Sequence, residues 1–139
     1  MKKDEEQLQE KYIEMKMIEQ QMQEMQKQAQ IVEQQLMEMM STVQSLEEFK
    51  KTDKGDKVLV PISSGVFVKA ELKDNTEFLV NVGADTVVSK DIDSTKKLIE
   101  KQVEELQGLQ EKIMMNMQKI GMRAGSVEEE LKELAAKVQ

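Results

Sequence analysis

The side chains with the most distinctive chemistry in this sequence are thioethers. Its 139 residues include twelve methionines but no cysteine, histidine or tryptophan. The chain therefore lacks thiolate nucleophiles, imidazole bases and nearly all soft metal ligands. A methionine side chain is unbranched and polarisable, so it adapts to apolar partners of many shapes. These residues favour apolar binding over catalysis, and we expect no enzyme activity, no metal site and no cofactor.

The methionines after Met1 are divided between two regions, residues 15–40 and 114–122. Five occupy positions assigned below to heptad seams, where packing in a helical core is the simpler interpretation: Met15, Met22, Met25, Met39 and Met117. Six lie outside the seams: Met17, Met37, Met40, Met114, Met115 and Met122. For these six, binding of apolar partners and the ordinary presence of methionine on helix surfaces remain equally open.

Charged groups are numerous, but they are not arranged for catalysis or for binding nucleic acid. The formal net charge is −7, and Arg123 is the single arginine. No region has the excess of basic residues that phosphate neutralisation requires. Adjacent acids such as Glu104 and Glu105 point in different directions on a helix and do not form a catalytic pair. The sequence has no glycine-rich phosphate loop, so no ATP site is expected.

Two heptad seams must position these side chains. The first repeats every seven residues from Leu8 and from Lys11, and the second repeats from Ile99 and from Val103. Eleven of the twelve positions in each seam are apolar, the exceptions being Lys11 and Gln110. Such 3-4 spacing is typical of a coiled coil. We therefore predict two long helices that pair antiparallel, with a register that the spacing leaves open.

The two predicted helices flank a segment of different composition. We divide the chain into an N-terminal coiled-coil helix (1–50), a β-hairpin oligomerisation segment (51–91) and a C-terminal coiled-coil helix (92–139). Asp91 or Asp93 can cap the second helix. Gly121 and Gly125 precede a possible capping box at Ser126, but the heptad continues through them in phase, which favours one continuous helix.

Residues 51–91 are rich in β-branched side chains and turn signals. We predict four strands: Val58–Ile62, Val66–Leu72, Thr76–Val82 and Thr86–Lys90. Pro61 cannot donate a ladder hydrogen bond, which indicates an edge strand or a bulge. The predicted fold is α+β but mainly α, a long antiparallel two-helix coiled coil joined by two short β-hairpins.

Two short hairpins bury too little surface to be stable alone, and their open edges invite association. Since the helices are already packed against each other, we expect hairpins of several chains to assemble into a shared sheet or an oligomeric β-barrel. The residues expected in this oligomerisation are apolar strand residues: Val58, Val60, Ile62, Val66, Val68, Phe78, Val80, Val82 and Val87.

Near the free ends of the helices, apolar residues exceed the needs of a two-residue seam. This end cluster contains Leu8, Tyr12, Ile13, Met15, Met17, Ile18, Val127, Leu131, Leu134 and Val138. Such a cluster can capture partner chains when the ends fray, or it can act as a staple that closes the helix pair.

The whole chain resembles the prefoldin family. The most specific parts are Leu59–Ile62 with the following Gly65, and Val82–Gly83 before the fourth strand. The segment between the helices has room for two hairpins, and in this respect the chain resembles an α-type subunit. The resemblance implies a heterohexamer of two α-type and four β-type subunits, with hairpins assembled into β-barrels. It also implies that coiled-coil ends hold unfolded proteins without ATP and deliver them to a group II chaperonin.

Under this resemblance, the end cluster is interpreted as client-binding. The expected partners are β-type prefoldin subunits, unfolded proteins and a group II chaperonin, but neither nucleic acid nor a membrane. No apolar run approaches the roughly 20 residues of a membrane span, and the first residues lack a signal-peptide core, so we expect a cytoplasmic protein. The alternative is a structural coiled-coil scaffold or a filament-forming prefoldin-like protein.

Overall fold

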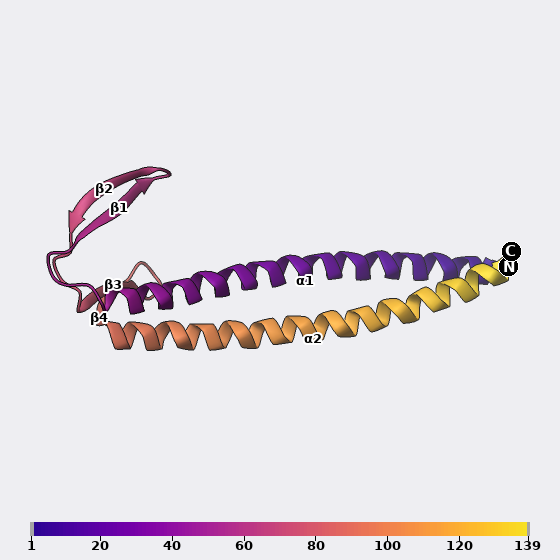
Figure 1. Cartoon of the computed structure of the whole chain (residues 1–139). Helices are drawn as coiled ribbons and strands as arrows, with labels where there is room; N and C mark the ends of the chain where they lie inside the picture. The colour runs from indigo at the N-terminus through magenta and orange to yellow at the C-terminus, as the bar shows by residue number, and fades with distance from the viewer. Residues whose placement is uncertain (1, 139) are drawn as a thin grey trace. The chain divides into compact units, whose positions relative to one another are not determined.

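The structure is a computed structural model that describes residues 2–138. Its elements follow the order α1 (Lys2–Phe49), β1 (Lys57–Ser63), β2 (Val66–Glu71), β3 (Glu77–Asn81), β4 (Val87–Asp91) and α2 (Ile92–Val138) (Figure 1). The predicted two helices and two intervening hairpins are confirmed.

The contacts of the chain divide it into two units, which we describe separately. The terminal unit contains α1 up to Gln35 and α2 from Leu106 onward, and the central unit contains Leu36–Glu105 with both hairpins.

The two helices are continuous, because neither contains a proline and the heptads keep their phase. Gly121 and Gly125 lie within α2, which confirms the prediction of one helix through this stretch. Open space surrounds the position of a Cβ atom at both glycines, so close packing does not require them. Within the described residues, neither helix has an apolar stretch long enough to cross a membrane.

Asp91 caps the start of α2. Its Oδ1 atom accepts a hydrogen bond of 2.7 Å from the Ser94 backbone N–H, which satisfies one of the free donors in the first turn. This bond is the main reason that the pKa of Asp91 lies below its ordinary value. Of the two predicted capping residues, the structure selects Asp91, and Asp93 lies inside the first turn.

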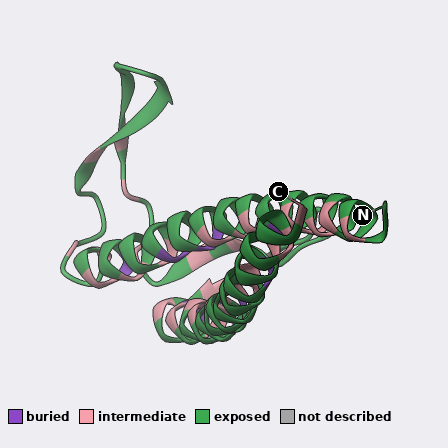
Figure 2. Ribbon diagram, turned by 90° about the vertical axis from the view of Figure 1, so that its right-hand side faces the viewer, coloured by how far each residue is buried: buried purple, intermediate pink, exposed green. Residues whose placement is uncertain are grey.

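The seams account for almost all burial along both helices. Every seam position is buried or half-buried, including the polar residues Lys11 and Gln110. The buried apolar residues are all seam residues: Ile18, Val32, Leu36, Leu46, Ile113 and Val127. Buried and half-buried residues follow a narrow stripe on each helix, and the remaining faces are exposed (Figure 2). The predicted coiled-coil pattern is therefore confirmed as a thin core.

In the central unit, the hairpins form two separate two-stranded antiparallel sheets, β1–β2 and β3–β4. The pairing of β1 with β2 shifts between Pro61 and Ser63, and β1 lies at an edge of its two-stranded sheet, which agrees with the edge strand or bulge predicted from the proline. The turn before β4 closes with a hydrogen bond of 3.0 Å from the Thr86 N–H to the Gly83 carbonyl. Ala84 and Asp85 in this turn have positive φ angles.

The β3–β4 hairpin is fixed to the end of α1. The rings of Phe49 and Phe78 meet edge to face, with centroids 6.0 Å apart and an interplanar angle of 81°. The Asn75 side-chain amide donates a hydrogen bond to the Thr52 carbonyl. Aromatic pairs in this geometry stabilise packing beyond their buried area. This hairpin thus has one face that is partly covered within the chain.

Candidate functional site

The end cluster lies in the terminal unit, where the structure separates its members into two groups. Ile18 and Val127 are each only 3% exposed, because they occupy seam positions between the helices. The other seam members are half-buried: Leu8, Met15, Leu131, Leu134 and Val138. These seven residues hold the two helices together in this structure.

Three members of the end cluster remain on the surface. Tyr12 and Ile13 are each 61% exposed and Met17 is 57% exposed. Ile13 and Met17 are four residues apart, so they are neighbours on one face of α1. A large apolar side chain that contributes nothing to the seam is available to another molecule. Of the predicted client-binding residues, these three form the accessible surface in the closed helix pair.

A network of four charged residues connects the helices beside this surface. Lys11 Nζ lies 2.6 Å from Glu130 Oε2 and 3.1 Å from Glu14 Oε2. Arg123 Nη2 lies 2.9 Å from the other oxygen of Glu14. Lys11 therefore extends its ammonium group out of the seam while its aliphatic part stays half-buried. The cross-helix pairs show which residues face each other in the terminal unit, a register that the heptads leave open.

These contacts also shift the acid–base equilibria of the network. The hydrogen bond from Arg123, followed by that from Lys11, holds the pKa of Glu14 below its ordinary value. The hydrogen bond to Glu130, followed by that to Glu14, raises the pKa of Lys11. In the central unit, Lys96 in the same way lowers the pKa of Glu47, 2.6 Å away. These shifts in pKa favour the charged forms of Lys11, Glu14 and Glu47, which suits ion pairs between the helices.

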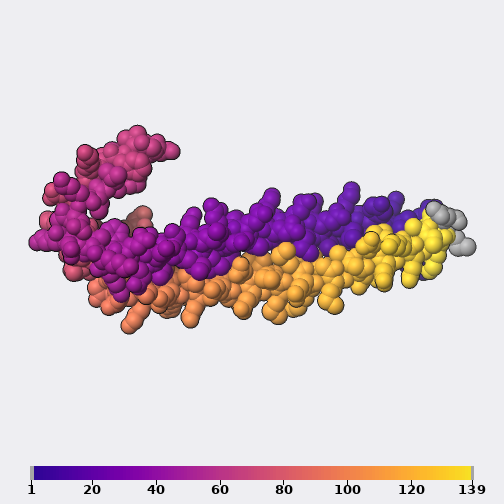
Figure 3. Space-filling model, viewed as in Figure 1, coloured from indigo at the N-terminus to yellow at the C-terminus, as the bar shows by residue number. Residues whose placement is uncertain are grey.

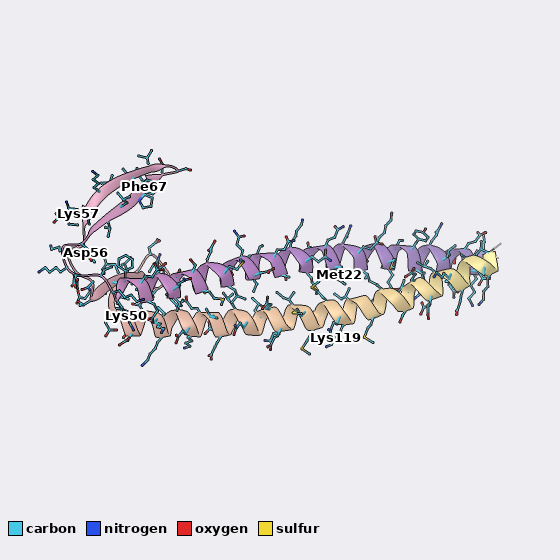
Figure 4. The ribbon with its side chains drawn as sticks, in the orientation of Figure 1. Met22, Lys50, Asp56, Lys57, Phe67 and Lys119 are labelled. Carbon is cyan, nitrogen blue, oxygen red and sulfur yellow. The ribbon has the colours of Figure 1, made fainter. Side chains whose placement is uncertain are left out.

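The methionines follow the predicted division between seam and surface. The five seam methionines are half-buried, and Met22 lies on the side of α1 that faces α2 (Figure 4). All six methionines outside the seams are exposed. In the space-filling view of the terminal unit, the two helices meet closely while other side chains project outward (Figure 3). On the helices, two large exposed apolar residues were not singled out by the sequence patterns, Ile31 and Leu109.

The predicted oligomerisation residues differ in how exposed they are. Six of them are exposed: Val60, Ile62, Val66, Val68, Val82 and Val87. Val58, Phe78 and Val80 are half-buried. Phe78 packs on Phe49 within the chain, so part of its surface is already used and cannot also contact another subunit.

The strand register shows that one face of β1–β2 is apolar and that the other mixes apolar residues with Lys57, Lys69 and Glu71. Val60 is opposite Val68 on one face, and Pro61 is opposite Phe67 on the other, which also contains Leu59. Among the residues of β1 and β2, only Val58 and Ala70 are half-buried, and the rest are exposed. An antiparallel sheet in a single chain usually has one solvated polar face. In β1–β2 the apolar face is exposed, and the mixed face also exposes Leu59 and Phe67.

The sequence prediction missed three apolar residues on these hairpins, namely Leu59, Phe67 and Leu79. Leu79 is 80% exposed, on the face of β3–β4 opposite to Phe78. The sequence does contain a sign of these residues. Side chains alternate between the two faces of a strand, and Leu59 and Phe67 are apolar residues on the face that otherwise has polar ones. Their pairing partners become known only with the register.

Two long helices with a thin seam, joined by two small antiparallel hairpins with exposed apolar residues, define the class of fold. The chain belongs to the prefoldin family: the family model for "Prefoldin subunit" matches residues 18–137. The recognition made from the sequence is thus confirmed.

Curated relatives are α-type subunits. The chain is 34% identical over 83 residues to "Prefoldin subunit alpha" of Methanobrevibacter smithii, in a match that covers 60% of this chain and 57% of that protein. It is 32% identical over 88 residues to "Prefoldin subunit alpha" of Thermofilum pendens, covering 63% of this chain and 68% of that protein. The first match thus spans little more than half of the relative's length.

A solved structure shares the fold. It is described as filamentous PFD from Methanocaldococcus jannaschii, with a TM-score of 0.75 and 15% sequence identity. The match covers 81% of this chain and 93% of that one. At this identity the likeness supports the arrangement of helices and hairpins.

Proposed function

We propose that this chain is the α-type subunit of an ATP-independent holdase, a cytoplasmic chaperone that catalyses no reaction. It takes up unfolded proteins on the ends of its coiled coil and passes them to a group II chaperonin. The observation that carries this proposal is the surface formed by Tyr12, Ile13 and Met17, whose large apolar side chains lie outside the seam. The names of the curated relatives support the α-type assignment.

The proposed mechanism is weak apolar contact repeated over several arms. A single patch of three side chains on a thin helix pair offers little area and binds poorly. Several such patches in one assembly raise the effective concentration of binding surface around a client. Because no chemical step is needed, release requires only that the chaperonin compete for the same apolar segments.

The proposed assembly is a heterohexamer of two α-type and four β-type subunits joined through a β-barrel. The uncovered faces of β1–β2 and the open strand edges support it, because such surfaces are stable in water only when they are paired or covered. The helices would then extend from the barrel as client-binding arms.

A surface substitution tests the client-binding role. In Tyr12→Gln/Ile13→Gln/Met17→Gln, the apolar patch becomes polar, while glutamine retains good helix propensity. We expect the hexamer reconstituted with a β-type partner to form normally and to lose most of its suppression of client aggregation. The matched control is Ile31→Gln/Met37→Gln/Met40→Gln, which alters three exposed apolar residues elsewhere on α1. Equal activity of the two variants would contradict the assignment to the helix ends.

A second candidate function is a structural filament, and one specific observation favours it: the solved structure with the same fold is described as filamentous. A head-to-tail interface that does not close produces an open filament, and β1–β2 offers exposed apolar residues on both faces for such contacts. Electron microscopy of the purified chain, with and without a β-type partner, separates the two candidates. Open filaments that ignore unfolded protein support the scaffold, whereas closed particles that bind it support the holdase.

A further inference from the structure

Six methionines project from the outer faces of the helices and are absent from every seam position. They are Met17, Met37, Met40, Met114, Met115 and Met122, and each is between 57% and 76% exposed. We call them the outer methionines. Met115 and Met122 are seven residues apart, so they point in nearly the same direction from α2. The seam methionines are half-buried, and Met1 lies outside the described residues.

Among residues 2–138, the outer methionines are the most exposed thioethers, and the sequence has no cysteine, histidine or tryptophan. A hydroperoxide can transfer one oxygen atom to the Sδ atom of methionine. The thioether loses two electrons and becomes a sulfoxide, while the O–O bond of the peroxide breaks and hydrogen peroxide is reduced to water. The product is polar instead of apolar, and methionine sulfoxide reductases reverse the reaction.

We propose that the outer methionines form an oxidation-responsive surface. Peroxide makes the apolar side chains of the outer methionines polar while the coiled coil and the hairpins keep their structure. Selectivity comes from burial, because the side chains of the seam methionines are half-buried and those of the outer methionines are exposed.

The distribution of methionine in the chain separates this surface from the structural core. A sulfoxide on an outer face replaces a contact with water and disturbs no seam packing. The strand segment contains no methionine, so oxidation leaves the proposed assembly surface unchanged. Oxidation of a seam methionine, by contrast, would place a polar sulfoxide between the helices and weaken them.

The consequence for client binding rests on the proposed function. Met17 is the one outer methionine that belongs to the proposed client-binding surface with Tyr12 and Ile13, so its oxidation weakens capture by removing an apolar contact and adding a polar group that competes for water. The chaperone would then lose capacity under strong peroxide stress and regain it by reduction, without unfolding or reassembly.

The experiment treats the full chain with increasing hydrogen peroxide and follows each methionine by peptide mass spectrometry. We expect the outer methionines to oxidise several-fold faster than Met15, Met22, Met25, Met39 and Met117. At the stage where only the outer set is oxidised, binding of the apolar dye anilinonaphthalene sulfonate should fall. The helix melting midpoint should remain unchanged, and methionine sulfoxide reductases should restore dye binding. Equal oxidation rates, or a midpoint that falls in step with oxidation of the outer set, would overturn the inference.

Matched variants locate the effect. Leucine is apolar, of similar volume and resistant to peroxide, so it replaces methionine with little disturbance. Substituting all six outer methionines with leucine should make dye binding insensitive to peroxide, whereas substituting the five seam methionines should leave the sensitivity intact. Unchanged sensitivity in the six-leucine variant would place the responsive surface elsewhere and overturn the inference.

Aggregation assays separate this inference from the proposed function. An untreated hexamer that fails to suppress aggregation contradicts the holdase proposal, while the oxidation order and the dye measurements still decide the inference about the surface. An untreated hexamer that suppresses aggregation equally well before and after selective oxidation overturns the link between Met17 oxidation and client binding.

Discussion

Ala84 and Asp85 adopt left-handed backbone in the turn between β3 and β4, with φ angles of 51° and 57°. This conformation brings the Cβ atom close to the following carbonyl oxygen and costs an ordinary residue about 1–2 kcal/mol. Aspartate and asparagine adopt it more readily, since their short polar side chains can hydrogen-bond locally. Ala84 therefore has a backbone conformation that is unfavourable for alanine.

We predict that Ala84→Asn raises the free energy of unfolding by about 0.5–1 kcal/mol, because asparagine fits the left-handed turn better. Ala84→Val should lower it, since a β-branched side chain is more strongly excluded from this region. Urea unfolding followed by circular dichroism, at a matched assembly state, measures both changes. A less stable Ala84→Asn variant would show that the turn has a different conformation.

Ile13 and Ile18 provide a second comparison at the residue scale, because the same residue type occupies the outer face and the seam of α1. Ile13 is 61% exposed and Ile18 is 3% exposed. Ile18→Ala should lower the free energy of unfolding by about 2–3 kcal/mol, through lost burial and the space left in the seam. Ile13→Ala should change it by less than about 0.5 kcal/mol. Similar effects in the two variants, measured by urea unfolding, would contradict the assigned seam.

At the scale of elements, the sequence predicted the helices, the strands and the seam because each depends on local periodicity. Leu8 and its successors every seven residues identify the buried stripe without reference to any partner. The edge strand or bulge expected at Pro61 likewise follows from one missing donor. These features are properties of one segment at a time.

Other element-scale features depend on pairing between segments and could not be predicted. The choice of Asp91 over Asp93 as the cap depends on where the strand β4 ends. The apolar residues on the mixed face of β1–β2 come together only when Pro61 is placed opposite Phe67. The helix register depends on contacts such as Lys11 with Glu130, which join residues far apart in the sequence. In the end cluster, the heptad pattern predicts that Ile18 lies in the seam and Ile13 does not. It does not predict how much of the Ile13 side chain is exposed.

The ion pairs between helices predict a dependence of stability on pH. Glu14 and Glu47 have lowered pKa values, mainly through Arg123 and Lys96 respectively. The stability that a carboxyl with a lowered pKa contributes is full above its unfolded value, about 4.3 for glutamate. It is lost as the pH falls through the lower pKa of the folded state.

We therefore expect the melting midpoint to fall on acidification below about pH 4. The fall should be smaller in Lys96→Gln/Arg123→Gln, which lacks the main partners of both carboxylates. Lysines follow the opposite sign: the raised pKa values of Lys11 and Lys96 contribute stability below about pH 10.4 that is lost as the pH rises further. Melting curves at low salt between pH 3 and pH 7 provide the acid comparison. An identical fall in both proteins would mean that these pairs do not couple folding to pH.

At the scale of the whole molecule, burial and exposure distinguish three kinds of surface. Seam residues hold the helices together, exposed apolar residues lie on both faces of β1–β2, where we propose that partner subunits bind, and other apolar residues are exposed on the outer faces of the helices. In this account, each surface can be altered without the others, since they occupy different residues.

The two faces of β1–β2 lead to a prediction about assembly. Val60→Lys places a charge on the apolar face and Leu59→Lys places one among the apolar residues of the mixed face, and we expect both to prevent assembly with the β-type partner, because burying an unpaired charge is costly. Lys69→Gln is the control, since it alters the exposed strand residue opposite Leu59 without adding a charge. Native mass spectrometry reports the outcome. Assembly of Leu59→Lys but not of Val60→Lys would mean that only one face is covered.

The central claim is that clients bind at the exposed helix-end residues and not along the polar faces of the arms. The most direct test places a photocrosslinking amino acid, benzoylphenylalanine, at Ile13 or at Gln34 in the assembled protein with an unfolded client. These positions are three heptads apart and are both exposed on the outer side of α1. Side chains at the two positions therefore point in the same direction and differ only in the residues around them. The account predicts strong client adducts from position 13 and weak ones from position 34. Equal adducts at both positions, or stronger ones at position 34, would contradict it.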